Sequence, residues 1–394
     1  METYCLKAVE EPDQELKDRI LYIMEKAYST VIWTLPDNYD SYLAFERAVS
    51  NLDLTSSPGY PYCLEKPTIG QWLEHDGLHP SWRAMQRLWI DVQRVFNGTF
   101  DHIQKVFIKM EPHKVSKIVE QRWRLIIASA LPVQVVWHML FDYQNDKEIE
   151  QAYYIPSQQG LKLCGGHWKL YYQQWKQRGF DVGLDKSAWD WTAPGWALML
   201  DLKFRLRMGR GSRMREWATT AAALYRDMFE TSKLLMPEGY LLQQEFCGLM
   251  KSGCVNTIST NSHMQVMIHI AANQHGKVYP LPSCCGDDTL QCSTQCDDLE
   301  KYRRYGIFVK QVERGLEFVG HRFEHDGPKP AYYSKHLYKA CYQEDDILPQ
   351  YLDSMCRMYV KTPQFEVWEN IASELGIKLF SREYYMYWYD VATD

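Results

Sequence analysis

The segment Cys284-Cys285-Gly286-Asp287-Asp288 constrains the fold more than any other feature of this chain. It lies inside residues 278–291, which read as two short strands around Gly286 and Asp287. Glycine accepts the positive φ of a tight primed turn, so the pattern predicts a β-hairpin with two carboxylates at its tip. Taken alone, a Gly-Asp-Asp tripeptide is most often only a turn.

A second acidic position favours a functional role for that hairpin over a simple turn. Residues 180–185 alternate like a strand that ends in Asp185, and Asp190 follows shortly after. If this strand lies beside the hairpin, Asp185 and Asp287 come together, and such carboxylates repel unless a proton or a cation intervenes. Mg²⁺ prefers oxygen ligands, and two ions roughly 3.5–4 Å apart clamp an in-line phosphoryl displacement. The sequence therefore favours a phosphoryl-transfer site.

A polar helix is the third feature. Residues 252–276 predict a long helix with Ser252 as its N-cap and Gly276 at its end. Polar or small residues recur at near-helical spacing: Ser252, Gly253, Asn256, Thr257, Ser259, Thr260 and Asn261. Such a stripe on an otherwise apolar helix is either satisfied by hydrogen bonds in the core or turned toward a ligand.

The remaining sequence predicts an α+β fold. With 394 residues, 46% of them hydrophobic and 24% charged, the chain can bury a large core. Strands are expected at residues 105–109, 122–127 and 307–312, with a further hairpin from 316–323 and 331–334. Helices are expected over residues 1–50, 71–96, 195–208, 297–306 and most of the C-terminal region.

The charge of the chain does not exclude a nucleic-acid partner. The net charge of −6 does not argue against RNA, because an enzyme that holds RNA in a channel needs only local positive charge. Basic clusters lie at residues 105–124 and 203–215, and the second could touch an RNA backbone or form a solvated helical face. Its members are Lys203, Arg205, Arg207, Arg210, Arg213 and Arg215.

The cysteine pattern and the apolar segments of the sequence indicate in which cellular compartment the protein is expected. Eleven cysteines without C-x-x-C pairs favour reduced thiols over a zinc site or disulfides. The longest apolar stretch, residues 125–141, is interrupted by Pro132, Gln134 and His138, so no membrane span is expected, and no signal peptide is recognised. An intracellular protein is the resulting expectation.

Together these motifs resemble those of viral RNA-dependent RNA polymerases, over about residues 55–325. Their residue sequences are most similar to those of the sobemovirus and luteovirus-like group. Asp-x4-Asp, Ser-Gly-x3-Thr-x3-Asn and Gly-Asp-Asp occur in the order of palm motifs A, B and C. Ser57-Pro58-Gly59-Tyr60-Pro61 resembles the loop where the template enters. The basic finger motif is matched by Lys109-Met110-Glu111-Pro112-His113-Lys114 with Lys117, Arg122 and Arg124, and the last two palm motifs by Lys310 and by residues 318–323.

The resemblance implies a right-hand polymerase architecture. Residues 1–179 would form an N-terminal region and fingers. Residues 180–325 would form a palm of antiparallel sheet and helices, with a fingers insertion at about 205–245. Residues 326–394 would form a small helical thumb.

The resemblance also implies residue roles. Asp185 and Asp287, assisted by Asp288, would hold two Mg²⁺ ions, with Mn²⁺ as a substitute. Lys310 would protonate the departing pyrophosphate. The triphosphate would pair with Arg124, Lys109 and Lys117, the ribose would contact Asp190, Ser252, Gly253, Thr257 and Asn261, and the RNA template would contact Ser57, Gly59 and Tyr60. A salt bridge to a surface carboxylate is the alternative for Arg124, and packing in the hairpin is the alternative for His321.

The expected function is RNA-dependent RNA polymerisation that copies viral genomic RNA by two-metal nucleotidyl transfer from NTPs. A reverse transcriptase, an inactive polymerase-like replicase subunit that binds RNA, and a metal-dependent phosphatase are the alternatives. Asp190 stands where reverse transcriptases have an aromatic residue, which favours an RNA product. Expected partners are RNA template and product and NTPs, with a protein primer and other viral replicase or host membrane factors as further candidates. The expected location is the host cell cytoplasm, including membrane-associated replication sites.

Overall fold

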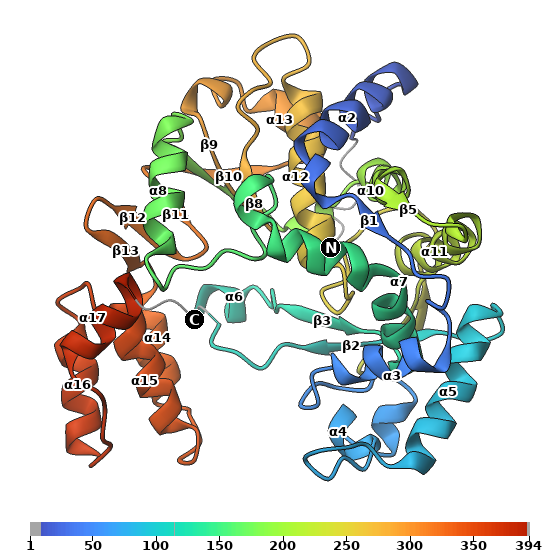
Figure 1. The fold of residues 1–394 in the computed structure, drawn as a ribbon, viewed down its shortest axis with the longest axis horizontal. Coiled ribbons are helices and arrows are strands. Elements are labelled where there is room, and N and C mark those ends of the chain that lie inside the picture. Colours follow the sequence, from blue (N-terminus) through green and yellow to red (C-terminus); the bar gives the residue numbers. More distant parts are fainter. Residues whose placement is uncertain (1–8, 114, 392–394) are drawn as a thin grey trace.

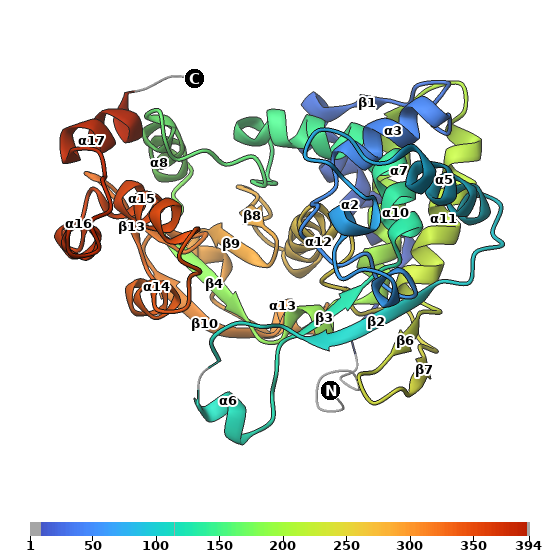
Figure 2. The same ribbon diagram turned by 90° about the horizontal axis from the view of Figure 1, so that it is seen from below.

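The computed structural model describes residues 9–113 and 115–391. Two groups of helices stand on opposite sides of the molecule, the N-terminal group in blue and the C-terminal group in red (Figure 1). A four-stranded sheet lies between them, and a turn of the molecule by 90° shows the same arrangement (Figure 2). None of the helices in the described ranges is long and apolar enough to cross a membrane.

The central sheet has the strand order β10-β4-β9-β8 and is antiparallel throughout. Its strands are β4 (Val182–Lys186), β8 (Ser283–Cys285), β9 (Asp288–Gln291) and β10 (Val309–Arg314). Val182, Leu184 and Lys186 are buried, whereas Asp185 is exposed, so β4 presents its acidic side chain to solvent from an otherwise buried strand. Gly183 has no room for a side chain, because a Cβ there would lie 2.6 Å from the Glu317 carbonyl oxygen.

Helices cover this sheet and join it to the N-terminal group. The main hydrophobic core includes residues of every one of the longer helices in this part of the chain. These helices are α2 (Gln14–Ala27), α3 (Tyr42–Ser50), α5 (Trp82–Phe96), α7 (Leu131–Glu150), α10 (Gly195–Met208), α11 (Met214–Phe229) and α12 (Thr257–Ala272); shorter ones are α4 (Ile69–Trp72), α9 (Trp189–Thr192) and α13 (Glu300–Arg304).

A second sheet, of order β3-β2-β6-β7, lies beside the N-terminal helices. Its strands are β2 (Ile103–Ile108), β3 (Leu125–Ala128), β6 (Lys233–Leu235) and β7 (Leu241–Gln243), and the loop between β2 and β3 carries α6 (Val115–Val119). The sequence did not predict β6 and β7, because three residues each are too few to show alternation. β6 pairs in parallel with β2. The segment between α11 and α12 therefore lies beside β2, a strand from much earlier in the sequence. Strands β1 (Trp33–Thr34) and β5 (Gly209–Arg210) form a separate short pair.

The C-terminal region packs around its own hydrophobic core. It contains the sheet β11 (Glu317–Phe318), β12 (His321–Glu324) and β13 (Gly327–Pro330), and the helices α14 (Tyr333–Ala340), α15 (Leu348–Tyr359), α16 (Phe365–Glu374) and α17 (Arg382–Asp390). Helix α8 (His167–Gln177) joins this core through Trp168, Tyr171 and Trp175, and the Trp168 indole also donates to Asp390 at 2.8 Å. Helix α8, which directly precedes β4 of the central sheet in the sequence, therefore contacts the C-terminal helices.

Four expectations about secondary structure were wrong. The helix expected over residues 1–50, of which residues 1–8 lie outside the described residues, is divided into α2 and α3 by a 3-10 turn and strand β1. The last strand lies at residues 327–330 and not at 331–334; its two prolines are tolerated because β13 pairs only with β12 and lies at an edge. The expected helix at 71–96 is interrupted between Trp72 and Trp82, around Gly77 and Pro80. The helix expected from Ser252 begins only at Thr257, with Asn256 as its cap residue.

The basic run at residues 203–215 does not form a single solvated face. Arg205 is fully buried and pairs with Asp201, while Arg213 pairs with Asp40 at 2.7 Å. Arg207 pairs with Asp18 at 3.5 Å. Much of this charge is therefore balanced within the protein, which argues against the whole run as an RNA contact.

Candidate active site

The three acids of the Asp185 and Gly-Asp-Asp motifs meet at one end of the central sheet. Cys285 pairs with Asp288 across a two-residue turn in which Gly286 has a φ of +64°. The register of β4 against β9 pairs Leu184 with Thr289, so Asp185 lies one step further, opposite Asp288. The predicted hairpin and its position beside the first acidic strand are therefore both present.

The charges of these carboxylates act on one another. Partial burial and the Asp287 carboxylate raise the pKa of Asp288 to about 6, with Asp185 adding to the effect, although the Asp288 side chain keeps contact with solvent. Proximity of like charges makes the ionised form costly. A cation bound here would reduce this repulsion, which is the behaviour expected of a metal-binding acidic pair.

A buried lysine lies beneath the acids. The Lys186 ammonium donates to the Leu184 carbonyl at 3.2 Å and to the Thr289 hydroxyl at 2.5 Å. Burial lowers its pKa to about 8, against the opposing influence of Cys284 and the three aspartates. Sequence reasoning missed this residue, although a lysine directly after Asp185 in a buried strand was a usable signal.

Lys310 reaches the first acid from the neighbouring strand. The register of β10 against β4 shifts between Val309 and Gln311, so Lys310 occupies a β-bulge. Its ammonium contacts Asp185 Oδ2 at 3.0 Å. The structure therefore brings Lys310 together with the acidic site, as the resemblance implied.

No cluster of three or more His, Cys, Asp or Glu side chains is close enough to hold a metal ion in the described parts of the chain. Asp185 is engaged by Lys310 in this arrangement. The donors nevertheless suit a hard cation, because they are carboxylate oxygens concentrated at one end of a rigid sheet.

The loop before α12 is held against strand β3. The Ser252 hydroxyl accepts from the Ile127 amide at 3.3 Å and donates to the Leu125 carbonyl at 3.4 Å, so Ser252 joins this loop to the backbone of β3 instead of capping a helix. The Gly253 amide donates to the Ile127 carbonyl at 3.2 Å, and a Cβ on Gly253 would lie 2.3 Å from that oxygen. The Thr257 hydroxyl donates to the Cys254 carbonyl at 2.6 Å. These three residues therefore shape the loop through backbone contacts.

Asn261 and Asp190 differ from those loop residues because their side chains retain binding capacity. Asn261 is buried, and its Oδ1 has no hydrogen-bond partner among the described residues. Asp190 is half-buried; burial and the Asp287 charge raise its pKa to about 6, and Arg124 opposes this. The Asp190 carbonyl accepts from the Met250 amide at 2.9 Å, which links the segment after β4 to the loop before α12.

The basic segment around β2 and β3 is internally paired. Arg124 contacts Glu111 at 2.9 Å and Lys109 contacts the same carboxylate at 3.3 Å. Burial of Glu111 works against its ionisation, but the two cations keep its pKa below the ordinary value. Arg124 thus makes a salt bridge, as in the alternative considered for it, but its partner Glu111 is largely buried and is not a surface carboxylate. A triphosphate would have to compete with Glu111. Lys117 lies on α6, which projects from the fold (Figure 2).

The loop expected at the template contacts helix α7. Leu131 donates its amide to the Pro58 carbonyl at 2.8 Å, and the Gly59 amide donates to the Ser57 hydroxyl at 3.2 Å. Gly59 has a φ of +68°, and a Cβ there would lie 2.1 Å from the Ser129 carbonyl oxygen. Glycine is required at that position by packing alone, while Tyr60 remains partly exposed.

A buried ionic network fixes the rotation of α12, and sequence reasoning missed it. His263 lies between Asp201, at 2.6 Å, and Glu148, at 2.9 Å, and Arg205 pairs with Asp201 at 3.0 Å. Thr260 on the same helix also donates to Asp201, at 2.8 Å. On the side facing the hairpin, the Ser262 hydroxyl accepts from the Gly286 amide at 2.9 Å. The helix is therefore tied both to α7 and α10 and to the acidic turn.

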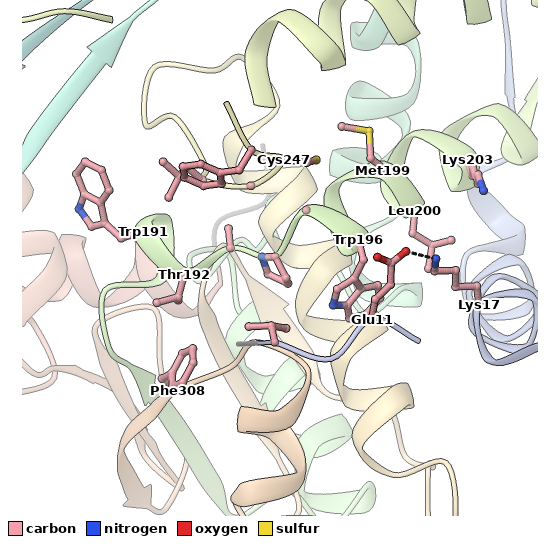
Figure 3. A pocket seen from close by; sticks show the side chains of 17 residues that line it. Glu11, Lys17, Trp191, Thr192, Trp196, Met199, Leu200, Lys203, Cys247 and Phe308 are labelled. Carbon is pink, nitrogen blue, oxygen red and sulfur yellow. Dashed lines mark hydrogen bonds and ion pairs between the residues drawn. The ribbon is translucent and has the colours of Figure 1, made fainter. Parts of the chain in front are cut away.

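A separate cavity of about 450 Å³ lies behind the segment that follows Asp190 (Figure 3). Its lining includes Trp191, Trp196 and Met199, and the ion pair between Glu11 and Lys17 lies at one side. The three clustered acids do not line it. This cavity and the acidic site are therefore distinct.

Comparison with known proteins gives consistent relatives. The chain is 30% identical over 348 residues to Protein P1-P2 of Pea enation mosaic virus-1 (strain WSG), an alignment that covers 79% of this chain and 28% of that protein. It is 32% identical over 260 residues to the RNA-directed RNA polymerase of Mushroom bacilliform virus (isolate Australia/AUS LF-1), covering 62% of this chain and 61% of that protein. A Replicase polyprotein P2AB, from Southern bean mosaic virus (isolate Bean/United States/Arkansas), is 29% identical over 271 residues, covering 63% of this chain and 26% of that protein.

The chain spans 28% and 33% of the length of the P1-P2 proteins from Pea enation mosaic virus-1 and Potato leafroll virus (strain Potato/Netherlands/Wageningen/1989). These relatives confirm the resemblance to sobemovirus and luteovirus-like proteins. Among solved structures, a Sicinivirus 3Dpol RNA dependent RNA polymerase matches 97% of this chain and 86% of its own, with a TM-score of 0.75 and 16% identity. That likeness confirms the predicted α+β polymerase fold.

The family comparison covers most of the sequence. Residues 4–303 match the model described as Viral RNA-dependent RNA polymerase. That range contains all three acidic and polar motifs around the active-site candidate, and the structural likeness extends through the C-terminal helices. The chain therefore belongs to the viral RNA-dependent RNA polymerase family.

Proposed function

We propose that the chain extends RNA on an RNA template by nucleotidyl transfer from NTPs, and that it copies viral genomic RNA. The observation that carries this proposal is the meeting of Asp185, Asp287 and Asp288 at one end of the central sheet. Beside them, α12 presents the Asn261 amide oxygen, which has no hydrogen-bond partner within residues 9–113 and 115–391. The names of the relatives, which include an RNA-directed RNA polymerase and replicase polyproteins, support the same activity.

Two Mg²⁺ ions, or Mn²⁺ in their place, would be held by Asp185 and Asp287 with help from Asp288. When bound, they would neutralise charge on the attacking and departing oxygens of the phosphoryl transfer. The raised pKa of Asp288 supports this assignment, because it reflects carboxylates packed closely enough to favour a shared cation. The Asp185 carboxylate would exchange its contact with Lys310 for this role.

Lys310 would then be free to act on the leaving group. Its ammonium lies at the acidic site in a bulge that directs it away from the regular ladder. From there it could donate a proton to pyrophosphate as the bond to the α-phosphorus breaks. Arg124, Lys109 and Lys117 would bind the triphosphate, and Arg124 suits this role because its planar guanidinium can donate two parallel hydrogen bonds.

The ribose would be recognised by Asp190 on α9 and Asn261 on α12, beside the loop that Ser252, Gly253 and Thr257 shape. A deoxyribose would leave the buried Asn261 amide without a partner, which penalises DNA precursors. Ser57 and Tyr60 would contact the template, with Gly59 shaping their loop.

We further propose the division into fingers, palm and thumb at the boundaries given above. The pairing of β6 with β2 supports a fingers insertion at about 205–245, and the separate hydrophobic core supports a C-terminal thumb. Helix α8 lies in the proposed N-terminal region but packs with the thumb. A protein primer, other replicase factors and membrane-associated sites in the host cytoplasm complete the proposal.

The test is primer extension with purified protein, an RNA template and Mg²⁺. The wild type should extend with ribonucleotides, whereas Asp287→Asn should bind the primed template equally well and extend at least about 1,000-fold more slowly, because it removes charge from the catalytic acids. A matched Asp298→Asn variant, on an exposed loop, should extend normally. Full extension by Asp287→Asn would refute the acidic site, and extension with deoxyribonucleotides alone would indicate a reverse transcriptase.

A further inference from the structure

Gln265 has a buried side-chain amide and has no role in the active site proposed above. Its side chain lies on α12 with 1% of its surface exposed, and neither Oε1 nor Nε2 has a hydrogen-bond partner among the described residues. Asn261, 4% exposed, has an unpartnered Oδ1. Buried polar groups are nearly always hydrogen-bonded, so three such atoms on two neighbouring side chains require an explanation.

The helix places the two amides together. Residues four apart lie one above the other on the same face of an α-helix, and a glutamine and an asparagine at this spacing can hydrogen-bond to each other. His263 lies two residues from each, and therefore on the opposite face, where Asp201 and Glu148 hold it. The buried ionic network thus fixes the rotation of α12 and keeps the amide face directed away from α7 and α10.

We propose that Gln265 is a positioning residue for ribose recognition. When a ribonucleotide occupies the site, Gln265 Nε2 donates to Asn261 Oδ1, and the Asn261 amide is thereby oriented to donate through Nδ2 to the ribose 2′-hydroxyl. This inference rests on the proposed function and adds a residue to it. The pairing uses atoms that are already buried and unpartnered, so it needs side-chain rotation and no movement of the helix.

The physical consequence separates this role from a structural one. Methionine has nearly the volume and helix propensity of glutamine, and it replaces two unpartnered polar atoms by apolar ones. Gln265→Met should therefore leave the urea midpoint unchanged or raise it. The same variant should reduce the ratio of kcat/KM for ATP to that for dATP by about three- to tenfold, the effect of losing one neutral hydrogen bond.

Gln295 offers a matched control. It is equally buried, and its Oε1 also has no partner among the described residues, but its Nε2 lies 3.1–3.2 Å from the carbonyls of Lys277, Val278 and Pro280, to which it donates. Gln295→Met should lower the urea midpoint and leave the ATP to dATP ratio unchanged. If it lowers that ratio as much as Gln265→Met does, the loss of selectivity is a general result of disturbance and the proposal is wrong.

A double variant tests whether Gln265 acts through Asn261. Because the proposed effect passes through one amide, adding Gln265→Met to Asn261→Ala should not reduce selectivity beyond the level of Asn261→Ala alone. A further loss, or an unchanged ratio in Gln265→Met by itself, overturns the proposal while leaving the polymerase assignment intact. If Asn261→Ala itself keeps the wild-type ratio, the ribose role assigned to that residue fails instead.

Discussion

Replacing His263 by leucine should be among the most destabilising single changes in this protein. His263, Asp201, Glu148 and Arg205 have no side-chain exposure, and their formal charges sum to zero only when the imidazole is protonated. In His263→Leu the network would hold two carboxylates and one guanidinium. Asp201 would keep Arg205, Tyr225 and Thr260 as partners, whereas Glu148 would lose its cation and keep Gln144 at 2.9 Å. Removal of one partner from a buried ion pair costs about 3–5 kcal/mol.

The size of the effect should depend on pH. Burial alone would lower the pKa of His263, but the Glu148 and Asp201 carboxylates outweigh it and raise the pKa above its ordinary value. A group whose pKa is raised by folding stabilises the protein fully below its unfolded pKa, and that stabilisation is lost as pH rises through the folded pKa. The rings of Tyr28 and Phe204 also face His263 and carry no charge. The difference between wild type and His263→Leu should therefore be larger at pH 6 than at pH 9.

The assay is urea unfolding followed by tryptophan fluorescence and circular dichroism at both pH values. The matched control is the double variant His263→Leu/Glu148→Gln, which restores charge balance by neutralising the orphaned acid. It should recover a large part of the lost stability. The reasoning is refuted if the single variant costs less than about 1 kcal/mol at pH 6, well below the range for buried pairs, or if the double variant is no more stable than the single one.

Two smaller changes test the loop before α12 and the bulge in β10. Gly253→Ala should destabilise the protein by about 1–3 kcal/mol, because the new Cβ would lie 2.3 Å from the Ile127 oxygen, whereas Gly276→Ala, whose nearest atom is 4.0 Å away, should change stability by less than about 0.5 kcal/mol; equal urea midpoints for the two would contradict the close packing. Lys310→Met should alter stability by less than about 1 kcal/mol, since its ion pair with Asp185 is largely exposed, but should slow single-turnover extension about 100-fold, with partial recovery in Lys310→Arg. Normal extension by Lys310→Met would remove that residue from the chemistry.

Features that depend on neighbouring residues in the sequence were predictable. The turn at Gly286 requires a positive φ that glycine adopts at no steric cost, and the apolar residues before Asp185 mark a buried strand, which ends one residue later, at Lys186. The central strands and the order of the three motifs were therefore visible before the structure. The position of Ser252 was misjudged for the complementary reason: serine is a common N-cap, but here its hydroxyl is occupied by the backbone of β3, more than a hundred residues away in the chain.

The sequence by itself determined which chemical groups the site could contain: acids at a glycine turn, an acid at a strand end, and amides along a helix. Only the tertiary structure decided which of them are already engaged. Glu111 holds Arg124 and Lys109, Lys310 reaches Asp185 from a bulge, and His263 joins two distant carboxylates, whereas Gln265 has no partner among the described residues. The physical reason is that hydrogen bonds and ion pairs form between side chains brought together by packing, and a local sequence pattern carries no record of a partner that arrives from another helix or strand.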